Sequence, residues 1–210
     1  MPKSTMRFLS ISVLFALVAA CGSSPVKGLA ETTVETPVFR STYFDDPAAD
    51  YVYKANVTVY GHELSGIFVA KKKDDGHRVV LTTEFGNKLI DIDLKETDYT
   101  VNAIVDELDR KILLETLVAD FRLMLRKEHH IAAQFDAPQA KILKATDGKK
   151  VNYLYLSTID GKLLQIKHAG KRKETITFRF HAENPTFAED IFIEHHDIKL
   201  KMVFKQLKNQ

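Results

Sequence analysis

The sequence predicts a mainly β protein of the α+β class, in which a strongly curved antiparallel sheet or incomplete β-barrel of about eleven strands carries one helix as a lid or plug. Three observations indicate this fold. Short runs of alternating apolar and polar residues cover most of the chain, turn-forming residues separate them, and only one long stretch has helical periodicity. No segment has the pattern of the long crossovers that parallel strands need, so antiparallel pairing is expected.

The first segment has the pattern of an export signal. Lys3 and Arg7 precede an apolar and small-residue run at 8–20, which is too short for a spanning helix of about 20 apolar residues. Residues 1–20 are therefore predicted to be a signal peptide. The Leu-Val-Ala-Ala sequence before Cys21 resembles the lipobox of bacterial lipoproteins, and this resemblance implies cleavage before Cys21, a diacylglyceryl thioether on its sulfur and an acylated amino terminus. The alternative is a generic signal with a coincidental cysteine.

Cysteine usage and charge narrow the class of protein further. Cys21 is the only cysteine, so no intramolecular disulfide can form and the domain must be held by its core. The chain has 30 basic and 28 acidic residues, and Lys3 and Arg7 lie in the signal peptide, so the mature chain is formally neutral. This balance gives no electrostatic case for nucleic-acid binding.

Two regions are expected after the signal peptide. Residues 21–50 are predicted to be the lipidated cysteine and a flexible tether, because a stretch rich in Ser, Thr, Pro and Glu cannot offset its ordering entropy by burial. Residues 51–210 are long enough for one domain with a substantial core, which we expect to be monomeric.

Five strands are predicted in the first half of this domain. The run that starts at Tyr51 has period two and ends before Gly61. The Lys-Lys-Asp-Asp-Gly sequence at 72–76 predicts a tight turn, because Asp and Gly tolerate positive φ. The predicted strands are 51–59, 64–71, 77–83, 88–94 and 99–105.

One helix follows, with Asp109 as the predicted N-cap and an end near Lys127. Its stripe of apolar residues at three- and four-residue spacing is wide, which suits a helix that plugs the open side of a curved sheet. The stripe consists of Ile112, Leu113, Leu117, Phe121, Met124 and Leu125, broadened by Leu114, Val118 and Leu123.

Strands resume after a short irregular linker that contains Pro138. Turn signals at Asp147-Gly148, Asp160-Gly161 and Gly170 separate the runs. The predicted strands are 141–144, 151–158, 162–168, 175–181, 190–195 and 198–207.

A barrel of this size encloses either packed side chains or an apolar cavity, and the sequence leaves both open. Core packing is the simpler interpretation for any single residue, and the cavity interpretation rests on the whole set. The candidates for the inner wall are Tyr53, Val57, Phe68, Ile90, Ile92, Leu117, Phe121, Tyr153, Tyr155, Ile176, Phe178 and Phe180.

An aromatic residue stands in the turn at 83–87, where polar residues and Gly are usual. Phe85 and Gly86 follow one predicted strand and precede the next. An apolar side chain in such a turn either folds back over the barrel mouth or is offered to an apolar partner. Because a lipid anchor is predicted on the same chain, we interpret Phe85 and Gly86 as a membrane-insertion loop.

The lipobox, the tether, the strand–helix–strand order and the segment RVVLTTEFGNKLIDID together resemble the LolA/LolB superfamily, and most of all its outer-membrane receptor branch, whose members are lipoproteins. In that family a strand of type R-x-x-L-T enters a loop with an exposed leucine followed by Gly. The residues at these positions here are Arg78, Leu81, Thr82, Phe85 and Gly86. The late segment 191–204 likewise resembles the family's closing strands. The chain departs from the family where Phe85 replaces an aliphatic residue, where Glu84 stands in place of a frequent proline, and in having no Trp.

The resemblance implies a protein without enzymatic activity or cofactor that is anchored in the outer membrane and faces the periplasm. Its partners would be membrane lipid through acylated Cys21, the acyl chains of other lipoproteins and a periplasmic LolA-like carrier. Two alternatives stay open: a lipoprotein that binds a small molecule or glycolipid on the same scaffold, and a structural envelope lipoprotein without ligand.

Other polar clusters in the sequence are candidates for catalytic or metal-binding sites. No G-x-S-x-G, P-loop or Cys/His nucleophile pattern is present. The pairs His129-His130 and His195-His196 invite a metal site, but adjacent residues on a strand face opposite sides, so we predict no metal.

Two charged patterns have a plain and a functional interpretation. Asp91 and Asp93 share one face of a strand, which we interpret as solvated rather than as a pair of catalytic acids. The basic clusters 71–73 and 167–173 are expected at hairpin ends, where they either protect strand edges or contact anionic head groups.

Overall fold

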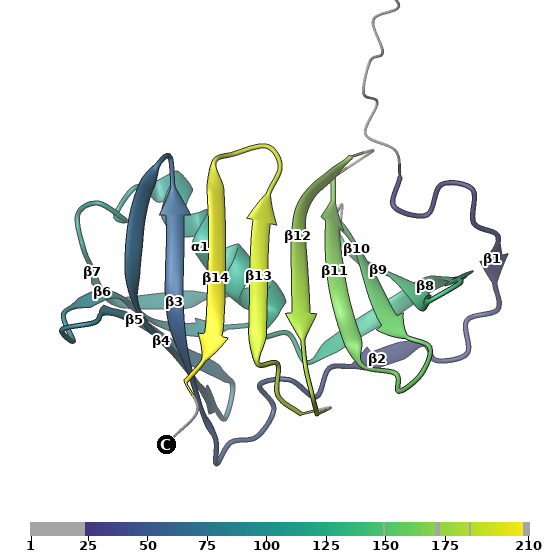
Figure 1. Cartoon of the computed structure of the whole chain (residues 1–210), viewed down its shortest axis with the longest axis horizontal. Coiled ribbons are helices and arrows are strands. Elements are labelled where there is room, and N and C mark those ends of the chain that lie inside the picture. Colours follow the sequence, from purple (N-terminus) through teal and green to yellow (C-terminus); the bar gives the residue numbers. More distant parts are fainter. Residues whose placement is uncertain (1–23, 149, 171–172, 185, 208–210) are drawn as a thin grey trace, which may run out of the picture.

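The computed structural model describes residues 24–148, 150–170, 173–184 and 186–207, so the signal peptide and Cys21 lie outside the described residues. Within these ranges the chain forms one antiparallel sheet of fourteen strands and one α-helix (Figure 1). The helix α1 is Lys111–Met124, and the strands are β1 (Glu31–Thr32), β2 (Val38–Arg40), β3 (Asp50–Val59), β4 (His62–Lys73), β5 (Gly76–Thr83), β6 (Lys88–Lys95), β7 (Tyr99–Ile104), β8 (Glu128–Ala137), β9 (Ala140–Asp147), β10 (Lys150–Ser157), β11 (Leu163–Ala169), β12 (Glu174–His181), β13 (Asp190–His195) and β14 (Leu200–Gln206).

The sheet is continuous but open. Its strand order is β1-β8-β9-β10-β11-β12-β13-β14-β3-β4-β5-β6-β7, and β2 also pairs with β8. The pairing of β14 with β3, in which Leu200 lies opposite Val59, joins the strands that follow the helix to those that precede it. The mainly β class and the open antiparallel sheet with one helix are thus confirmed.

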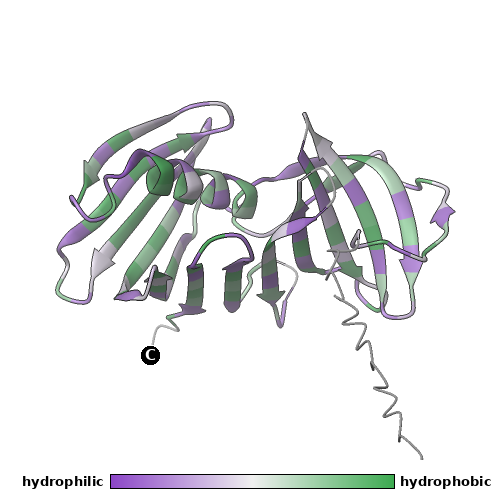
Figure 2. Ribbon diagram, turned by 90° about the horizontal axis from the view of Figure 1, so that it is seen from above, coloured by the Kyte–Doolittle hydropathy of each residue, from purple (hydrophilic) through white to green (hydrophobic). Residues whose placement is uncertain are grey.

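The helix lies on the concave side of this sheet. Figure 2, which views the molecule from above, shows the sheet bent around α1. The buried face of α1 carries Leu113, Leu117, Val118, Phe121, Leu123 and Met124. Burial of this stripe against the sheet is the main source of stability for a helix of this length.

Aromatic side chains fill the space between α1 and the middle of the sheet. The ring of Phe68 lies 5.4 Å from that of Phe121 and 4.7 Å from that of Phe204, measured between centroids. Tyr53, Phe68 and Phe204 have no exposed surface. The interior is therefore packed with side chains in this structure.

The helix is shorter than predicted at both ends. Arg110, rather than Asp109, is the N-cap residue, and its side chain makes no capping hydrogen bond. The helix ends at Met124, because Leu125 has ψ near 0° and the next N–H, that of Arg126, bonds to the carbonyl of Leu123, three residues back instead of four.

The prediction of about eleven strands was too low, since the described residues contain fourteen. The added strands are β1, β2 and β8. The sequence predicts only an irregular linker between the helix and residue 141, whereas the structure forms β8 there, with the side chains of His129 and Gln134 buried. Pro138 lies in the short turn that follows β8.

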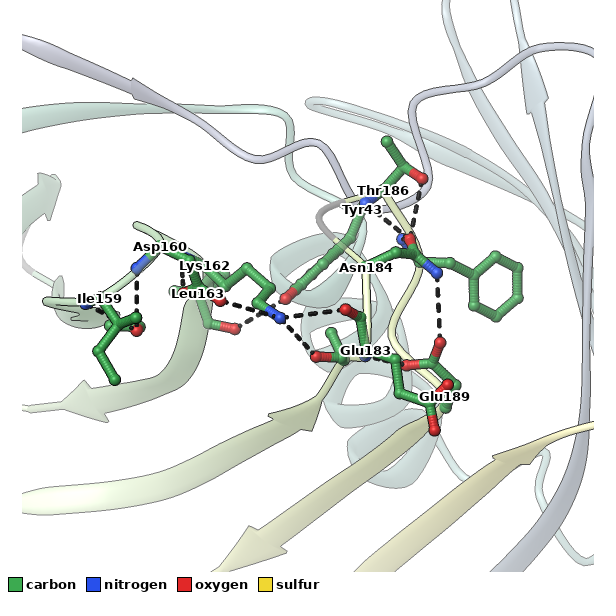
Figure 3. Close-up of polar contacts among 12 residues, drawn as sticks. Tyr43, Ile159, Asp160, Lys162, Leu163, Glu183, Asn184, Thr186 and Glu189 are labelled. Carbon is green, nitrogen blue, oxygen red and sulfur yellow. Dashed lines mark hydrogen bonds and ion pairs between the residues drawn. The ribbon is translucent and has the colours of Figure 1, made fainter.

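Much of the expected tether is folded. We call residues 24–40 the strap, because this segment runs along the sheet and pairs with β8 through both β1 and β2. Beyond the strap, Tyr43 and Phe44 are buried in the main core. In Figure 3 the Tyr43 hydroxyl donates to the carbonyl of Leu163 at 3.1 Å, beside Lys162, whose Nζ donates to the carbonyl of Glu183 at 3.2 Å.

A second, smaller apolar cluster lies on the other face of the sheet. It contains Ala133, Phe135, Ile142, Tyr153 and Ala169, with Tyr155, Val26 and Leu29 packed against it. Tyr153 and Tyr155 were predicted to face the interior, and this was wrong: on β10 the residues that join the main core are Leu154 and Leu156. Both faces of β10 are apolar because the strap covers its outer face, so the alternation alone did not distinguish inside from outside.

Candidate functional site

The turn between β5 and β6 presents an aromatic side chain to solvent. Phe85 is 94% exposed. The turn is held by hydrogen bonds from the N–H of Thr83 to the carbonyl of Asn87 at 2.8 Å and from the N–H of Gly86 to the carbonyl of Thr83 at 3.0 Å. Gly86 has φ of 86°, which suits glycine. The alternative in which Phe85 folds back over the sheet is therefore wrong in this structure.

A second large apolar side chain is equally exposed. Ile159, in the turn between β10 and β11, is also 94% exposed. The strand pairings place the turn that holds Phe85 at the same end of the strands as Tyr60. They place the turn that holds Ile159 at the opposite end. Exposure by itself therefore does not single out Phe85.

Most of the predicted cavity residues are packed in the main core. This cluster includes Tyr53, Val57, Phe68, Ile90, Ile92, Leu117, Phe121, Phe178 and Phe180, with Ile176 at its margin. Of the predicted set, Ile176 alone lines any of the three clefts described below. Ten of the twelve predicted residues therefore lie in or beside the main core, and the structure shows this core filled with side chains.

An open cleft lies beside α1, and we call it the helix cleft. Its volume is about 510 Å³, and its walls come from one side of α1 and from the facing ends of β12 and β13. The apolar part of its lining is formed by Ile112, Ala119, Ile176 and Ile198, and the polar part includes Asp120, Lys150, His168, Thr175 and His195.

A buried carboxylate and a histidine meet at the wall of the helix cleft. Nε2 of His195 lies 2.7 Å from Oδ2 of Asp120, and the two side chains are 4% and 1% exposed. Burial raises the pKa of Asp120, although the hydrogen bond with His195 opposes this shift. Among the described residues, Oδ1 of Asp120 has no hydrogen-bond partner. Sequence reasoning missed this pair, and the available signal was an acidic residue at 120 within the apolar stripe between Leu117 and Phe121.

A smaller cleft of about 130 Å³ adjoins the helix cleft and shares Asp120, Lys150 and His168 with it. Nδ1 of His168 lies 2.7 Å from Oδ1 of Asn152, whose side chain is buried. The two clefts together bring polar side chains from α1, β10, β11, β12 and β13 to one region of the concave side.

A third cleft of about 360 Å³ lies near the C-terminal end of α1 and is lined by several basic residues. Their charges are largely balanced by acidic partners. Lys72 and Lys127 both pair with Asp45, and Lys95 pairs with Asp75 at 2.6 Å. This cleft is therefore a network of ion pairs rather than an exposed cationic surface.

Asp91 was predicted to lie on a solvated strand face, and this was wrong. Its side chain has no exposed surface and accepts a bidentate hydrogen bond from Arg78 at 3.0 and 2.8 Å. Lys88 and Asn102 donate to the same carboxylate at 2.7 and 3.3 Å. These bonds, that from Arg78 first, lower the pKa of Asp91 well below its usual value, against the effect of burial. Asp93, on the same face, is 31% exposed and pairs with Lys73.

Three of the four histidines in these pairs contact other side chains. His195 faces Asp120, and His196 faces the other side of the strand, where its Nε2 lies 2.8 Å from Oγ1 of Thr177. His129 is buried in β8 beside the ring of Phe39. Within the described residues, no group of three or more His, Cys, Asp or Glu side chains is arranged to hold a metal ion.

The two basic clusters also have local partners. Lys71 pairs with Asp50 at 2.9 Å, and Lys73 with Asp93. Lys167 pairs with Glu174 at 3.0 Å and lies over the ring of Tyr155. Residues 171–172 of the second cluster lie outside the described residues.

Comparison with models of protein families, with curated protein sequences and with solved structures found no match to this chain. In the part of the chain that the structure describes, no helix has both the length and the apolar character needed to cross a bilayer.

Proposed function

We propose that this protein is a lipoprotein of the outer membrane, anchored through acyl groups on Cys21 and facing the periplasm, that binds acyl chains and accepts or inserts other lipoproteins. The main observation behind this proposal is the exposure of Phe85. An aromatic side chain that is 94% exposed on a well hydrogen-bonded turn is suited to enter a bilayer, because its desolvation is favourable and the turn is already ordered. The lipobox before Cys21 and the LolA/LolB resemblance of residues 78–93 support the same function.

Acyl binding on this scaffold requires α1 to move. The interior under α1 is packed, so an acyl chain can enter the curve of the sheet only by replacing the helix stripe. A 16-carbon chain gains about 12 kcal/mol on burial at about 0.8 kcal/mol per methylene. Exposing the six buried apolar side chains of α1 costs about 12 kcal/mol at about 2 kcal/mol each.

The two terms nearly cancel, so exchange of the helix for an acyl chain is close to balanced. A balanced exchange suits a protein that must both take up and release its cargo. Each acyl chain then passes between apolar sites without a nucleotide or a metal, and a periplasmic LolA-like carrier would supply the cargo.

The test compares two matched variants. In cells that depend on this protein, Phe85→Glu should lower the fraction of lipoproteins recovered in the outer membrane at least tenfold, and Ile159→Glu should leave it unchanged. Both residues are 94% exposed, so neither substitution should change the thermal midpoint of the purified domain. Normal delivery by a folded Phe85→Glu variant, or an equal loss in both variants, would contradict the proposal.

A second candidate is a lipoprotein that binds a small molecule or glycolipid in the helix cleft. The observation that favours it is the buried Asp120, whose Oδ1 has no hydrogen-bond partner among the residues that the structure describes and is free to accept a hydrogen bond from a ligand hydroxyl. A purely structural envelope lipoprotein is the third candidate, and the filled interior favours it. Native mass spectrometry of the purified protein separates the three: co-purified acylated protein supports the first, a bound small ligand that is lost in Asp120→Leu supports the second, and no ligand supports the third.

A further inference from the structure

The strap begins close to the predicted lipidation site. Its first described residue is Ser24, and only Gly22 and Ser23 lie between Ser24 and Cys21. Three residues of fully extended chain span at most about 11 Å. A flexible tether over the whole of residues 22–50 would instead have a root-mean-square reach of about 30 Å. The link between Cys21 and the strap is thus much shorter than the tether that the composition predicted.

The start of the strap is ordered by its own backbone bonds and by the sheet. The N–H of Lys27 donates to the carbonyl of Ser24 at 3.0 Å, and the N–H of Leu29 donates to that of Val26 at 3.2 Å. The hydroxyl of Tyr155, on β10, donates to the carbonyl of Pro25 at 3.2 Å. The strap is therefore fixed to the sheet from its second residue onward.

Apolar and charged contacts continue along the strap. Val26 and Leu29 pack on the outer cluster that contains Tyr153 and Phe135. Further on, the carboxylate of Glu35 lies 2.7 Å from Nζ of Lys141, and β1 and β2 add backbone bonds to β8. The strap consequently has contacts of three kinds along its length.

We infer that the strap is a rigid mount, which holds the half of the sheet formed by β8–β11 directly against a phospholipid bilayer. The inference rests on acylation of Cys21, which is part of the proposed function. The acyl groups at Cys21 lie in the membrane, and Ser24 lies within about 11 Å of that point. In Figure 1 the strap lies beside β8–β11. The strand pairings place Lys150 and the Phe85 turn at one end of the strands and the turn that holds Thr97 at the other, so the mount and Phe85 face the same side. The domain therefore does not swing freely below its anchor.

The experiment uses the acylated full-length protein in vesicles of phosphatidylethanolamine and phosphatidylglycerol. Single cysteines replace the exposed residues Lys27, Lys150 and Thr97, and each is labelled with an environment-sensitive fluorophore. Lys27 lies in the strap, Lys150 begins β10, and Thr97 lies in the turn between β6 and β7. Lipids with a nitroxide head group should quench the labels at 27 and 150 at least threefold more than the label at 97.

Two further variants test whether the strap is the cause of the expected quenching pattern. A 20-residue Gly-Ser linker inserted after Gly22 should reduce quenching at positions 27 and 150 to the level at 97. The double variant Val26→Asp/Leu29→Asp should release the strap and reduce quenching at 150 in the same way. The matched control, Ala30→Asp/Thr33→Asp, changes two exposed strap residues and should keep the wild-type pattern.

Equal quenching at the three positions in the unmodified protein, or quenching unchanged by the linker, would overturn the inference. Absence of acyl groups from Cys21 in the mass spectrum would overturn both the mount and the proposed function. Normal quenching together with normal lipoprotein delivery by Phe85→Glu would overturn the proposed delivery role alone.

Discussion

Nε2 of His195 on β13 lies 2.7 Å from Oδ2 of Asp120 on α1, and this buried contact joins the concave face of the sheet to the helix. The pair is unusual because Asp120 stands within the apolar stripe of the helix. A buried pair of this kind adds little stability over apolar residues of similar size, but it is costly to break from one side.

A double-mutant cycle tests this coupling. Asp120→Leu and His195→Leu should each lower the free energy of unfolding by about 3 kcal/mol, because each leaves a buried polar group without its partner at 2.7 Å. The double variant should lose about 1 kcal/mol, since it removes both polar groups. Urea denaturation measures all three. Additive losses would show that the two side chains act independently.

Asp91 should determine part of the acid sensitivity of the domain. Its folded-state pKa is lowered, so its contribution to stability is present above the ordinary carboxyl pKa of 3.8 and is lost as the pH falls below that value. Asp91→Asn should destabilise the domain by about 3 kcal/mol at pH 7 and flatten the acid limb of the stability curve below pH 3.8.

The control for Asp91 is the exposed ion pair of Asp75 with Lys95. Asp75→Asn should leave the denaturation midpoint nearly unchanged, because solvent screens an exposed pair. Chemical denaturation at several pH values makes the comparison. If the acid limbs of wild type and Asp91→Asn coincided, Asp91 would not be the group that titrates there.

Gly66 in β4 should tolerate no side chain. A Cβ at this position would lie 1.7 Å from the carbonyl oxygen of Thr82 on the neighbouring strand, and backbone atoms cannot move aside cheaply. Gly66→Ala should therefore cost about 3 kcal/mol or more. Glu63→Ala, at an exposed position on the same strand, should change the thermal midpoint little. Similar midpoints for the two variants would show that β4 and β5 separate at this point.

Phe121 tests whether the interior is packed. Phe121→Ala should cost about 3–5 kcal/mol, because it leaves a cavity beside Phe68. Ile112→Ala, on the same helix but 80% exposed, should cost less than about 0.5 kcal/mol. Denaturation curves of both variants suffice. A cost below about 1 kcal/mol for Phe121→Ala would indicate that α1 packs loosely and that an acyl chain could enter without displacing it.

Local alternation predicted the sheet where one face is clearly apolar. On β6, Ile90 and Ile92 were assigned to the interior, and both are fully buried there. On β10, Tyr153 and Tyr155 were assigned to the same side as those residues, although they lie on the outer face under the strap. The strand pattern could not reveal the strap, because the strap's contacts join residues more than a hundred positions apart.

The burial of polar side chains is the other reason why the structure differs from the predictions. His129 and Gln134 are buried in β8, and Asp91 is buried in an ion-pair network, so polarity in the sequence did not mark exposure at these positions. The sequence identified a single residue as unusual only where that residue departs from a local pattern, as Phe85 does in its turn. The Asp120–His195 pair could not be predicted in this way, because it joins α1 and β13, and the local sequence pattern does not show that these two elements meet.

The position of the strap also bears on self-association. Without β1 and β2, the outer edge of β8 would present a ten-residue row of unpaired backbone groups, which is a template for aggregation with a second molecule. Thr32 precedes its partner Gln134 by 102 residues in the chain. The residues that cap this edge are therefore synthesised well before the edge itself, so the edge is never the last part of the sheet to wait for its cover.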